Sequence, residues 1–231
     1  MRSRHRTSKL LLRQGILWSG GTAWTGAHHA WLATQHFELL GLQVAYDSTL
    51  DSVLLAQGRR DRLDKTIVEM AREPQWWPTV TRLQCLRGVS TLTAFGLAVE
   101  VGDWTRFTGS TIGAFLGLVP TESSSGEGRQ QGSITKTGNT HARRLLVEAA
   151  WHHRRPYRPT KTMRDRWDLA PAAARARGHA GNQRLHDRWT RFDARHKRTV
   201  IANVAVAREL AGWCWSLATL PEAAATAGRR P

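Results

Sequence analysis

The chain has 231 residues, which is enough for one domain of ordinary size or for two small ones. It carries 34 Lys and Arg side chains against 18 Asp and Glu, a formal net charge of +16. A phosphate polymer is the commonest reason for such an excess, because each cation near a phosphate releases bound counterions. The alternative is a basic tail on an unrelated fold, but the arginines are spread along the chain.

Several other classes of protein are excluded. The cysteines, Cys85 and Cys214, are too few for a disulfide framework or a four-ligand zinc site, and their apolar neighbours predict buried thiols. The histidine pairs at 28–29 and 152–153 lack a third ligand at a recognisable spacing. The basic start is followed by too few apolar residues for a signal peptide, and no apolar run is long enough to cross a membrane. We therefore expect a cytoplasmic protein with no membrane partner.

The first region, residues 1–75, has a helical pattern throughout. We expect a short basic helix over 8–14, a break at two glycines, and a helix over 23–37. Apolar residues spaced through 40–71 predict a long amphipathic helix, which Gly58 would weaken. Because the spacing is not a strict heptad, a helical hairpin or an imperfect coiled-coil arm fits better than a long zipper.

The second region, residues 76–160, follows a segment with two tryptophans and two prolines that punctuates the chain. A short apolar helix meets a turn at Arg87-Gly88-Val89-Ser90, and a second helix follows, with Ser90 or Thr91 as N-cap and an end near Gly102. This layout resembles the helix-hairpin-helix, which presents backbone N–H groups to DNA phosphates. Ser90 stands where a second glycine is usual, so a phosphate contact and a plain structural turn both remain open.

A run of three serines, Ser123 to Ser125, ends in a glycine and leads into a basic loop rich in Gly and Gln. A serine can attack phosphorus if it can lose its proton and if the pentacovalent phosphate is stabilised. The cations close to it in sequence are Arg129, Lys136, Arg143 and Arg144. No general base or acidic cluster accompanies them, so composition alone leaves a flexible, hydroxyl-rich linker as the alternative.

Helices are expected on both sides of the serine run. A short one precedes it over 110–116, and one over 141–153 follows, capped by Asn139 or Thr140. The arginines of the second helix are left for solvent or a polyanion.

A third region, 161–220, begins as a basic, partly irregular segment. We expect helices over 182–197 and 200–218, followed by a disordered tail over 221–231. The predicted fold class is mainly α: a helical connector or coiled-coil arm followed by a compact helical domain.

The segment from Gly117 to Leu146 resembles the C-terminal transposase domain of the insertion-sequence family 110/116/902. That family shows a Gly-Leu-x-Pro, a Ser-Gly, a Gly-x-Ile-(Ser/Thr)-Lys-x-Gly and an Arg-Arg-Leu-Leu helix. The corresponding residues here are 117–120, 125–126, 132–138 and 143–146. The lead-in GVSTLTAFGLAVEVGDWTRF and the downstream ANVAVARELAGWCW also match, so the resemblance covers most of the chain.

The resemblance implies a function. In this family, a serine of the Ser-Gly element attacks DNA and forms a covalent phosphoserine link, which points to Ser125, with Ser124 as the alternative. Members excise and insert their element in assemblies of several protomers, guided by an RNA from the element. We therefore expect DNA as a partner, a guide RNA, and association with further copies or with a full-length transposase. The residues expected to contact DNA are Arg87, Gly88, Ser90, Arg129, Lys136, Arg143 and Arg144.

The chain also departs from the family pattern. Complete members begin with a RuvC-like domain whose Asp-Glu-Asp-Asp set binds divalent metal, whereas this sequence starts at the helical connector. The acidic residues of 47–64 follow a polar helical pattern and do not form that set. We therefore expect no cofactor in this chain, with Mg²⁺ bound only by the missing domain, and weak or absent catalysis by the chain alone. A non-catalytic DNA- or RNA-binding remnant is the alternative function.

Overall fold

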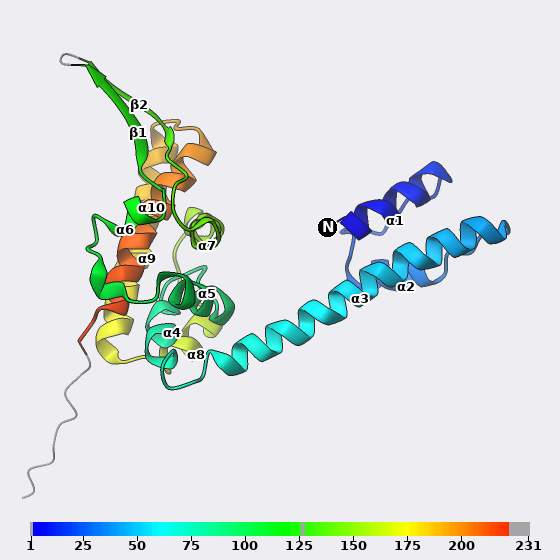
Figure 1. The fold of residues 1–231 in the computed structure, drawn as a ribbon, viewed down its shortest axis with the longest axis horizontal. Coiled ribbons are helices and arrows are strands. Elements are labelled where there is room, and N and C mark those ends of the chain that lie inside the picture. The colour runs from blue at the N-terminus through cyan, green and yellow to red at the C-terminus, as the bar shows by residue number, and fades with distance from the viewer. Residues whose placement is uncertain (1, 126–127, 222–231) are drawn as a thin grey trace, which may run out of the picture. The chain divides into compact units, whose positions relative to one another are not determined.

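The computed structural model describes residues 2–125 and 128–221, and for 123–125 and 128–131 it describes the backbone alone. Over these residues the chain forms ten α-helices and one two-stranded sheet, which confirms the prediction of a mainly α fold (Figure 1). The chain divides into two compact units, Met1–Thr66 and Ile67–Pro231. The sequence had placed its first boundary between residues 75 and 76. Of the predicted disordered tail, residues 222–231 lie outside the described residues.

The first unit has a small hydrophobic core of its own. It consists of α1 (Arg2–Arg13), α2 (Gly26–Ala33) and most of α3 (Leu40–Met70). Helix α2 is shorter than the predicted 23–37, because the Thr25 hydroxyl caps its first turn by accepting from the backbone N–H of His28. The buried residues that these helices share are Leu11, Leu32, Phe37 and Tyr46.

Helix α3 is one uninterrupted helix, so the expected helical hairpin is wrong. Gly58 lies within it, and a Cβ at this position would meet only the tip of the Arg62 side chain, at 3.7 Å. One glycine costs a helix about 1 kcal/mol, which the good helix formers around it offset. Several apolar side chains of α3 are exposed, among them Leu54 at 49%, Leu55 at 74% and Leu63 at 52%.

The second unit is built around α10, which packs against α4, α6, α7 and α9. A single core runs from Ala71 to Leu217, so the predicted regions 76–160 and 161–220 share one hydrophobic interior. The elements of this unit are α4 (Trp77–Leu83), α5 (Thr91–Val101), α6 (Ile112–Phe115), β1 (Pro120–Ser125), β2 (Gly128–Ile134), α7 (Thr140–Ala150), α8 (Lys161–Trp167), α9 (Ala172–Ala194) and α10 (Thr199–Ala218), with 3₁₀ turns at Trp104–Arg106 and Trp151–Arg154.

Helix α9 begins ten residues before the predicted 182, in the stretch that was expected to be irregular. Its two glycines resemble helix breakers in the sequence, but they lie where neighbouring segments approach closely. A Cβ on Gly178 would lie 2.5 Å from the Cβ of Cys85, and one on Gly181 would lie 2.9 Å from the Trp213 ring. The alanines of 172–174 favour the helix, and the glycines let it pack tightly.

Two thiols and one charged side chain are buried in the second unit. Cys85 and Cys214 are buried free thiols, as predicted, and burial raises the pKa of each to about 12. The side chain of Arg82 is buried as well, and its Nη1 donates to the carbonyls of Leu220 at 2.7 Å and Ala218 at 3.4 Å. These bonds satisfy a charge that would otherwise be costly to bury.

Among the described residues, no helix combines the length and apolar character needed to cross a membrane.

Candidate nucleic-acid interface

The serine run lies in strand β1, and Gly128–Ile134 of the expected Gly- and Gln-rich loop form strand β2, so the loop expectation is wrong for these residues. Strands β1 and β2 pair antiparallel, with Ser125 opposite Gly128 and Ser124 opposite Arg129, and the register shifts between Pro120 and Glu122. Figure 1 shows the two strands running out from the helices of the second unit. The hairpin could not be predicted from the sequence, because the segment contains few of the β-branched and aromatic residues that are typical of strands. The side chains of Ser124, Ser125 and Arg129 lie outside the described part of the chain.

The two ends of the hairpin are joined closely at its base. The backbone N–H of Thr135 donates to the Val119 carbonyl at 2.9 Å, and that of Lys136 donates to the Gly117 carbonyl at 3.1 Å. Gly117 and Gly138 have φ of +64° and +73°, and a Cβ on Gly138 would lie 1.9 Å from the Phe115 carbonyl oxygen. Only glycine fits such a crossing, so both glycines serve to anchor the hairpin.

Arg143 ties α7 to this base. Its Nη1 donates to the carbonyls of Leu116 at 3.0 Å and Thr137 at 2.8 Å, so part of its hydrogen-bonding capacity is used inside the protein. Arg144 differs, because its side chain is exposed and no hydrogen bond or ion pair is found for it within the described residues. Lys136 is exposed too. Of the three cations predicted here, Lys136 and Arg144 are the ones open to a ligand.

Asn139 is the N-cap of α7, which decides between the two predicted caps. Its side-chain oxygen accepts from the backbone N–H of Ala142 at 2.9 Å, while its Nδ2 donates to the Glu100 carboxylate. The same carboxylate lies 2.7 Å from Nδ1 of His141. The hydrogen bonds from Asn139 and then from His141 lower the pKa of Glu100 below its ordinary value. The Glu100 carboxylate therefore holds the start of α7 against α5.

The predicted turn before α5 has clear structural roles. Ser90 is the N-cap, and its hydroxyl accepts from the Thr93 N–H at 3.3 Å. Arg87 Nη1 donates to two carbonyls, those of Arg155 at 2.8 Å and Pro156 at 3.0 Å. Gly88 has φ of +81°, and a Cβ there would lie 2.5 Å from the Ala149 carbonyl oxygen. Capping, hydrogen bonding and close packing therefore explain these three residues without a bound ligand.

The same three residues nevertheless line an open cavity of about 510 Å³. The structure thus brings Arg87, Gly88 and Ser90 together, whereas Lys136, Arg143 and Arg144 do not line this cavity. Sequence reasoning missed several polar members of its wall, which come from segments without a motif: Glu148, His152, Thr160, Thr162 and Arg166.

A buried imidazole lies near this turn. His153 is fully buried, and the preceding residue, His152, lines the cavity. Burial, and secondly the charge of Arg87, lower the pKa of His153 to about 3. His153 is therefore neutral at any pH near 7, and it adds no positive charge to the interface.

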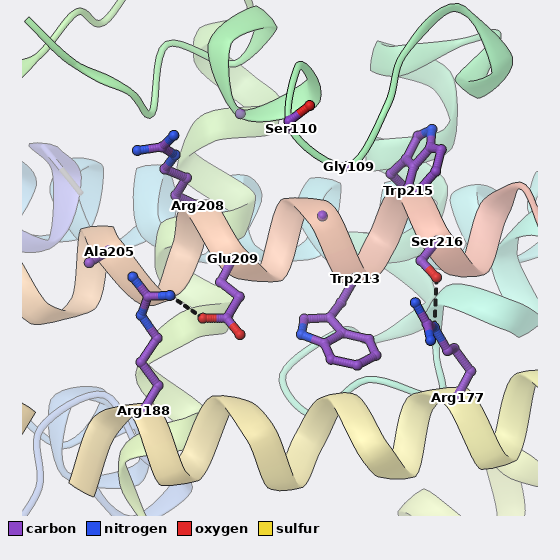
Figure 2. Close-up of a pocket in the computed structure, with 12 residues that line it drawn as sticks. Gly109, Ser110, Arg177, Arg188, Ala205, Arg208, Glu209, Trp213, Trp215 and Ser216 are labelled. Atoms are coloured by element: carbon purple, nitrogen blue, oxygen red, sulfur yellow. Dashed lines mark hydrogen bonds and ion pairs between the residues drawn. The ribbon is translucent and has the colours of Figure 1, made fainter. Parts of the chain in front are cut away.

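A second cavity, which the sequence did not predict, lies along α10. We call it the α9–α10 groove, and its volume is about 430 Å³. Figure 2 shows Arg177 and Arg188 extending from α9 toward α10, with Arg208 and Ser110 on the other side of α10. Its lining residues are Gly109, Ser110, Gly113, Arg177, Arg188, Ala205, Arg208, Glu209, Gly212, Trp213, Trp215 and Ser216.

The family resemblance assigns Mg²⁺ to the acidic set of a RuvC-like domain, and the described residues contain no comparable set. No group of three or more His, Cys, Asp or Glu side chains within them could hold a metal ion. The acidic residues of 47–64 lie on α3, as their polar pattern predicted.

Sequence comparison identifies the class of protein to which this mainly helical domain with its anchored hairpin belongs. Residues 80–167 match the profile of the transposase IS116/IS110/IS902 family. This range holds the turn at Arg87, the hairpin, its glycine-lined base and the start of the segment after α7. The chain therefore contains a domain of the IS116/IS110/IS902 transposase family, over residues 80–167.

Individual relatives extend the similarity beyond that range. The chain is 34% identical over 218 residues to a Sinorhizobium fredii protein named "Putative transposase y4qE", covering 93% of this chain and 52% of the relative. It is 30% identical over 200 residues to the transposase for insertion sequence element IS1533 of Leptospira borgpetersenii, covering 85% of this chain and 58% of the relative. The chain thus spans little more than half the length of these curated relatives.

Proposed function

We propose that this chain is part of an insertion-sequence transposase that binds DNA, and that Ser125 is its nucleophile, with Ser124 as the alternative. The observation that carries the proposal is the anchoring of the hairpin. The family motif residues Gly117, Gly138 and Arg143 all act at its base, through close backbone approach and hydrogen bonds to carbonyls. A serine strand held on such a base can be presented to a DNA backbone in a defined position.

The proposed step is a transesterification at phosphorus. The serine Oγ forms a bond to a DNA phosphorus atom while the bond from that phosphorus to one flanking deoxyribose oxygen breaks. The hydroxyl proton leaves the serine and is taken up in the end by the departing deoxyribose oxygen. Cations and N–H donors close to the phosphate would stabilise the pentacovalent state.

DNA binding is supported by charge. The chain has a formal net charge of +16, and the exposed side chains of Lys136 and Arg144 flank the base of the hairpin. We extend the proposal to an assembly of several protomers that includes a guide RNA. The exposed apolar side chains of α3 support the assembly, because association would cover them.

The test uses supercoiled DNA that carries the ends of the element, with the purified chain alone and with a full-length relative added. Ser125→Ala, Ser124→Ala and, as a matched control, Ser123→Ala are compared for a protein–DNA adduct that survives denaturation. Loss in Ser125→Ala alone, with DNA binding retained, supports the assignment. An adduct that persists in Ser123→Ala, Ser124→Ala and Ser125→Ala alike contradicts a serine nucleophile in this run. DNA binding without an adduct in any sample favours the non-catalytic DNA- or RNA-binding alternative.

A further inference from the structure

The floor of the α9–α10 groove consists of small residues on one face of α10. Ala205, Gly212 and Ser216 follow one another at spacings of seven and four residues, which places them in a row along the helix. The missing side chain of Gly212 brings α10 close to the segment before α6, since a Cβ there would lie 3.2 Å from the Gly109 carbonyl oxygen. Because these residues are small, they leave an open channel between α9 and the segment that contains Gly109.

The walls of the groove have an excess of positive charge. Three arginines line it, Arg177, Arg188 and Arg208, against one carboxylate, Glu209. Both oxygens of that carboxylate are already engaged, one by Arg184 at 3.0 Å and the other by Arg188. An anion entering the groove therefore meets a neutralised Glu209 and two further arginines.

Those two arginines are placed for a ligand. Arg177 lies over the Trp213 ring, 4.8 Å from its centre, and its Nε donates to the Ser216 hydroxyl at 2.7 Å. These contacts fix the position of the guanidinium, and its two terminal nitrogens are left to donate to a ligand. The stem of Arg208 lies against Gly113, 3.2 Å from the place of a Cβ, and its side chain is exposed. No hydrogen bond or ion pair is found for Arg208 within the described residues.

A buried donor also lacks a partner here. Nε of Arg188 is buried and has no hydrogen-bond acceptor among the described residues. A buried N–H without an acceptor is unfavourable, and an anionic oxygen would supply the missing acceptor. The hydroxyls of Ser110 and Ser216 are further donors in the same lining.

The dimensions favour a chain of phosphates over a single one. Arg177 and Arg188 are eleven residues apart on α9, as Ala205 and Ser216 are on α10, which corresponds to about 16 Å along each helix. Successive phosphates of a B-form strand rise by about 3.4 Å, so several could lie along such a length.

We propose that the α9–α10 groove is a phosphate-binding site that holds the backbone of a nucleic-acid strand, separately from the serine hairpin. The inference rests on the proposed function only in taking nucleic acid as the partner. Arg177 and Arg208 supply the free charge, and Ser110 and Ser216 supply neutral donors. Most of the groove lies on α9 and α10, beyond the range 80–167 that matches the family profile.

The experiment measures binding of a fluorescein-labelled 20-nucleotide oligodeoxythymidine by anisotropy over a series of NaCl concentrations. The test variant is Arg177→Gln/Arg208→Gln, and Arg59→Gln/Arg62→Gln on α3 is the control that removes the same charge. At low salt we expect the test variant to bind at least about 5-fold more weakly than the control. Its plot of log affinity against log salt should be shallower by about 1.4, because two phosphate contacts are lost at about 0.7 each.

Arg208→Gln alone keeps the test valid if the double variant unfolds, because Arg208 is exposed; it should lose about 0.7 of slope. Equal affinity and equal slope for groove and control variants would overturn the proposal. A second arm titrates inorganic phosphate at constant ionic strength and follows thermal unfolding. Stabilisation by phosphate that the groove variants abolish, with oligonucleotide binding unchanged, would also overturn it, since the site would then hold free phosphate.

The two proposals fail separately. The groove variants leave the serine run unaltered, so the adduct assay tests the nucleophile independently of the groove. If the unaltered chain binds and the groove variants bind equally well, only the groove inference fails. If the unaltered chain itself does not bind at low salt, the DNA-binding part of the proposed function fails as well.

Discussion

The hairpin base and the α9–α10 groove use arginine in opposite ways. At the base, Arg143 donates to the carbonyls of Leu116 and Thr137, and its guanidinium acts as a structural clamp between segments. In the groove, Arg208 has an exposed head and faces an open channel. The first arginine lies in a family motif and the second does not. Position in a motif therefore does not show whether the charge of an arginine is available to a ligand.

The largest effect should come from Gly138→Ala at the hairpin base. The left-handed backbone costs about 1–3 kcal/mol for a residue with a Cβ, and the clash with the Phe115 carbonyl adds about 1–3 kcal/mol of overpacking. Gly102→Ala is the matched control, because Gly102 also has positive φ, at +67°, but open space around it. Urea unfolding of both variants measures the difference. If both variants lost the same free energy of unfolding, the hairpin base would not be tightly packed, and the contrast between a clamped base and an open groove would not hold.

Arg143→Ala and Arg208→Ala test the comparison directly. Removing Arg143 should lower the free energy of unfolding by about 2–3 kcal/mol, because it leaves two carbonyls without their charged donor. Removing Arg208 should change it by less than about 0.5 kcal/mol, as expected for an exposed side chain without a partner. The same urea series decides between them. A larger loss of stability for Arg208→Ala than for Arg143→Ala would reverse the two roles.

The turn at Arg87 can be tested through the buried His153. Its pKa of about 3 in the folded chain lies below the ordinary 6.5, so between these values the unfolded chain binds a proton that the folded chain does not. Stability should therefore fall as pH falls below 6.5, by about 1.4 kcal/mol per pH unit from this group. His153→Leu should remove that slope, which unfolding at pH 6 and pH 5 would show. An unchanged slope would indicate that His153 becomes charged inside the folded protein.

The smallest effect concerns Glu100, which orders the start of α7 beside the hairpin base. Its pKa is lowered in the folded chain by the hydrogen bonds from Asn139 and His141, so its stabilisation is present above its ordinary value of 4.5 and is lost as pH falls further. Glu100→Gln should therefore reduce the acid-induced loss of stability below pH 4.5 and leave the behaviour between pH 5 and 6 unaltered. Thermal unfolding between pH 6 and pH 3 measures both ranges. If the profile below pH 4.5 does not change, the carboxylate does not hold α7.

Local signals predicted the elements of this fold well where they are strong. Helix α5 begins after the Ser90 cap and ends at Gly102, and α10 (Thr199–Ala218) has nearly the predicted bounds of 200–218. The signals failed for α9, because Gly178 and Gly181 resemble breakers until their distant contacts with Cys85 and Trp213 are known. Such contacts depend on tertiary packing, which periodicity and capping rules do not contain.

The candidate site was predicted only in part for the same reason. The serine run and its neighbouring cations were found because they lie together in one stretch of sequence. That Arg87 and Arg143 donate to carbonyls was not visible, since hydrogen-bond partners follow from the fold. The α9–α10 groove was missed because three segments, 109–113, 177–188 and 205–216, contribute to it and none contains a motif.

The buried guanidinium of Arg82 bears on where this protein can be shortened. The arginine belongs to α4, whereas its two acceptors are the carbonyls of Ala218, the last residue of α10, and of Leu220, two residues further along the chain. A recombinant fragment that ended before Ala218 would keep nearly all of the apolar interior and still leave a buried cation without acceptors. The last turn of α10 is therefore a functional boundary for engineering, and a fusion partner or affinity tag should be attached beyond Leu220.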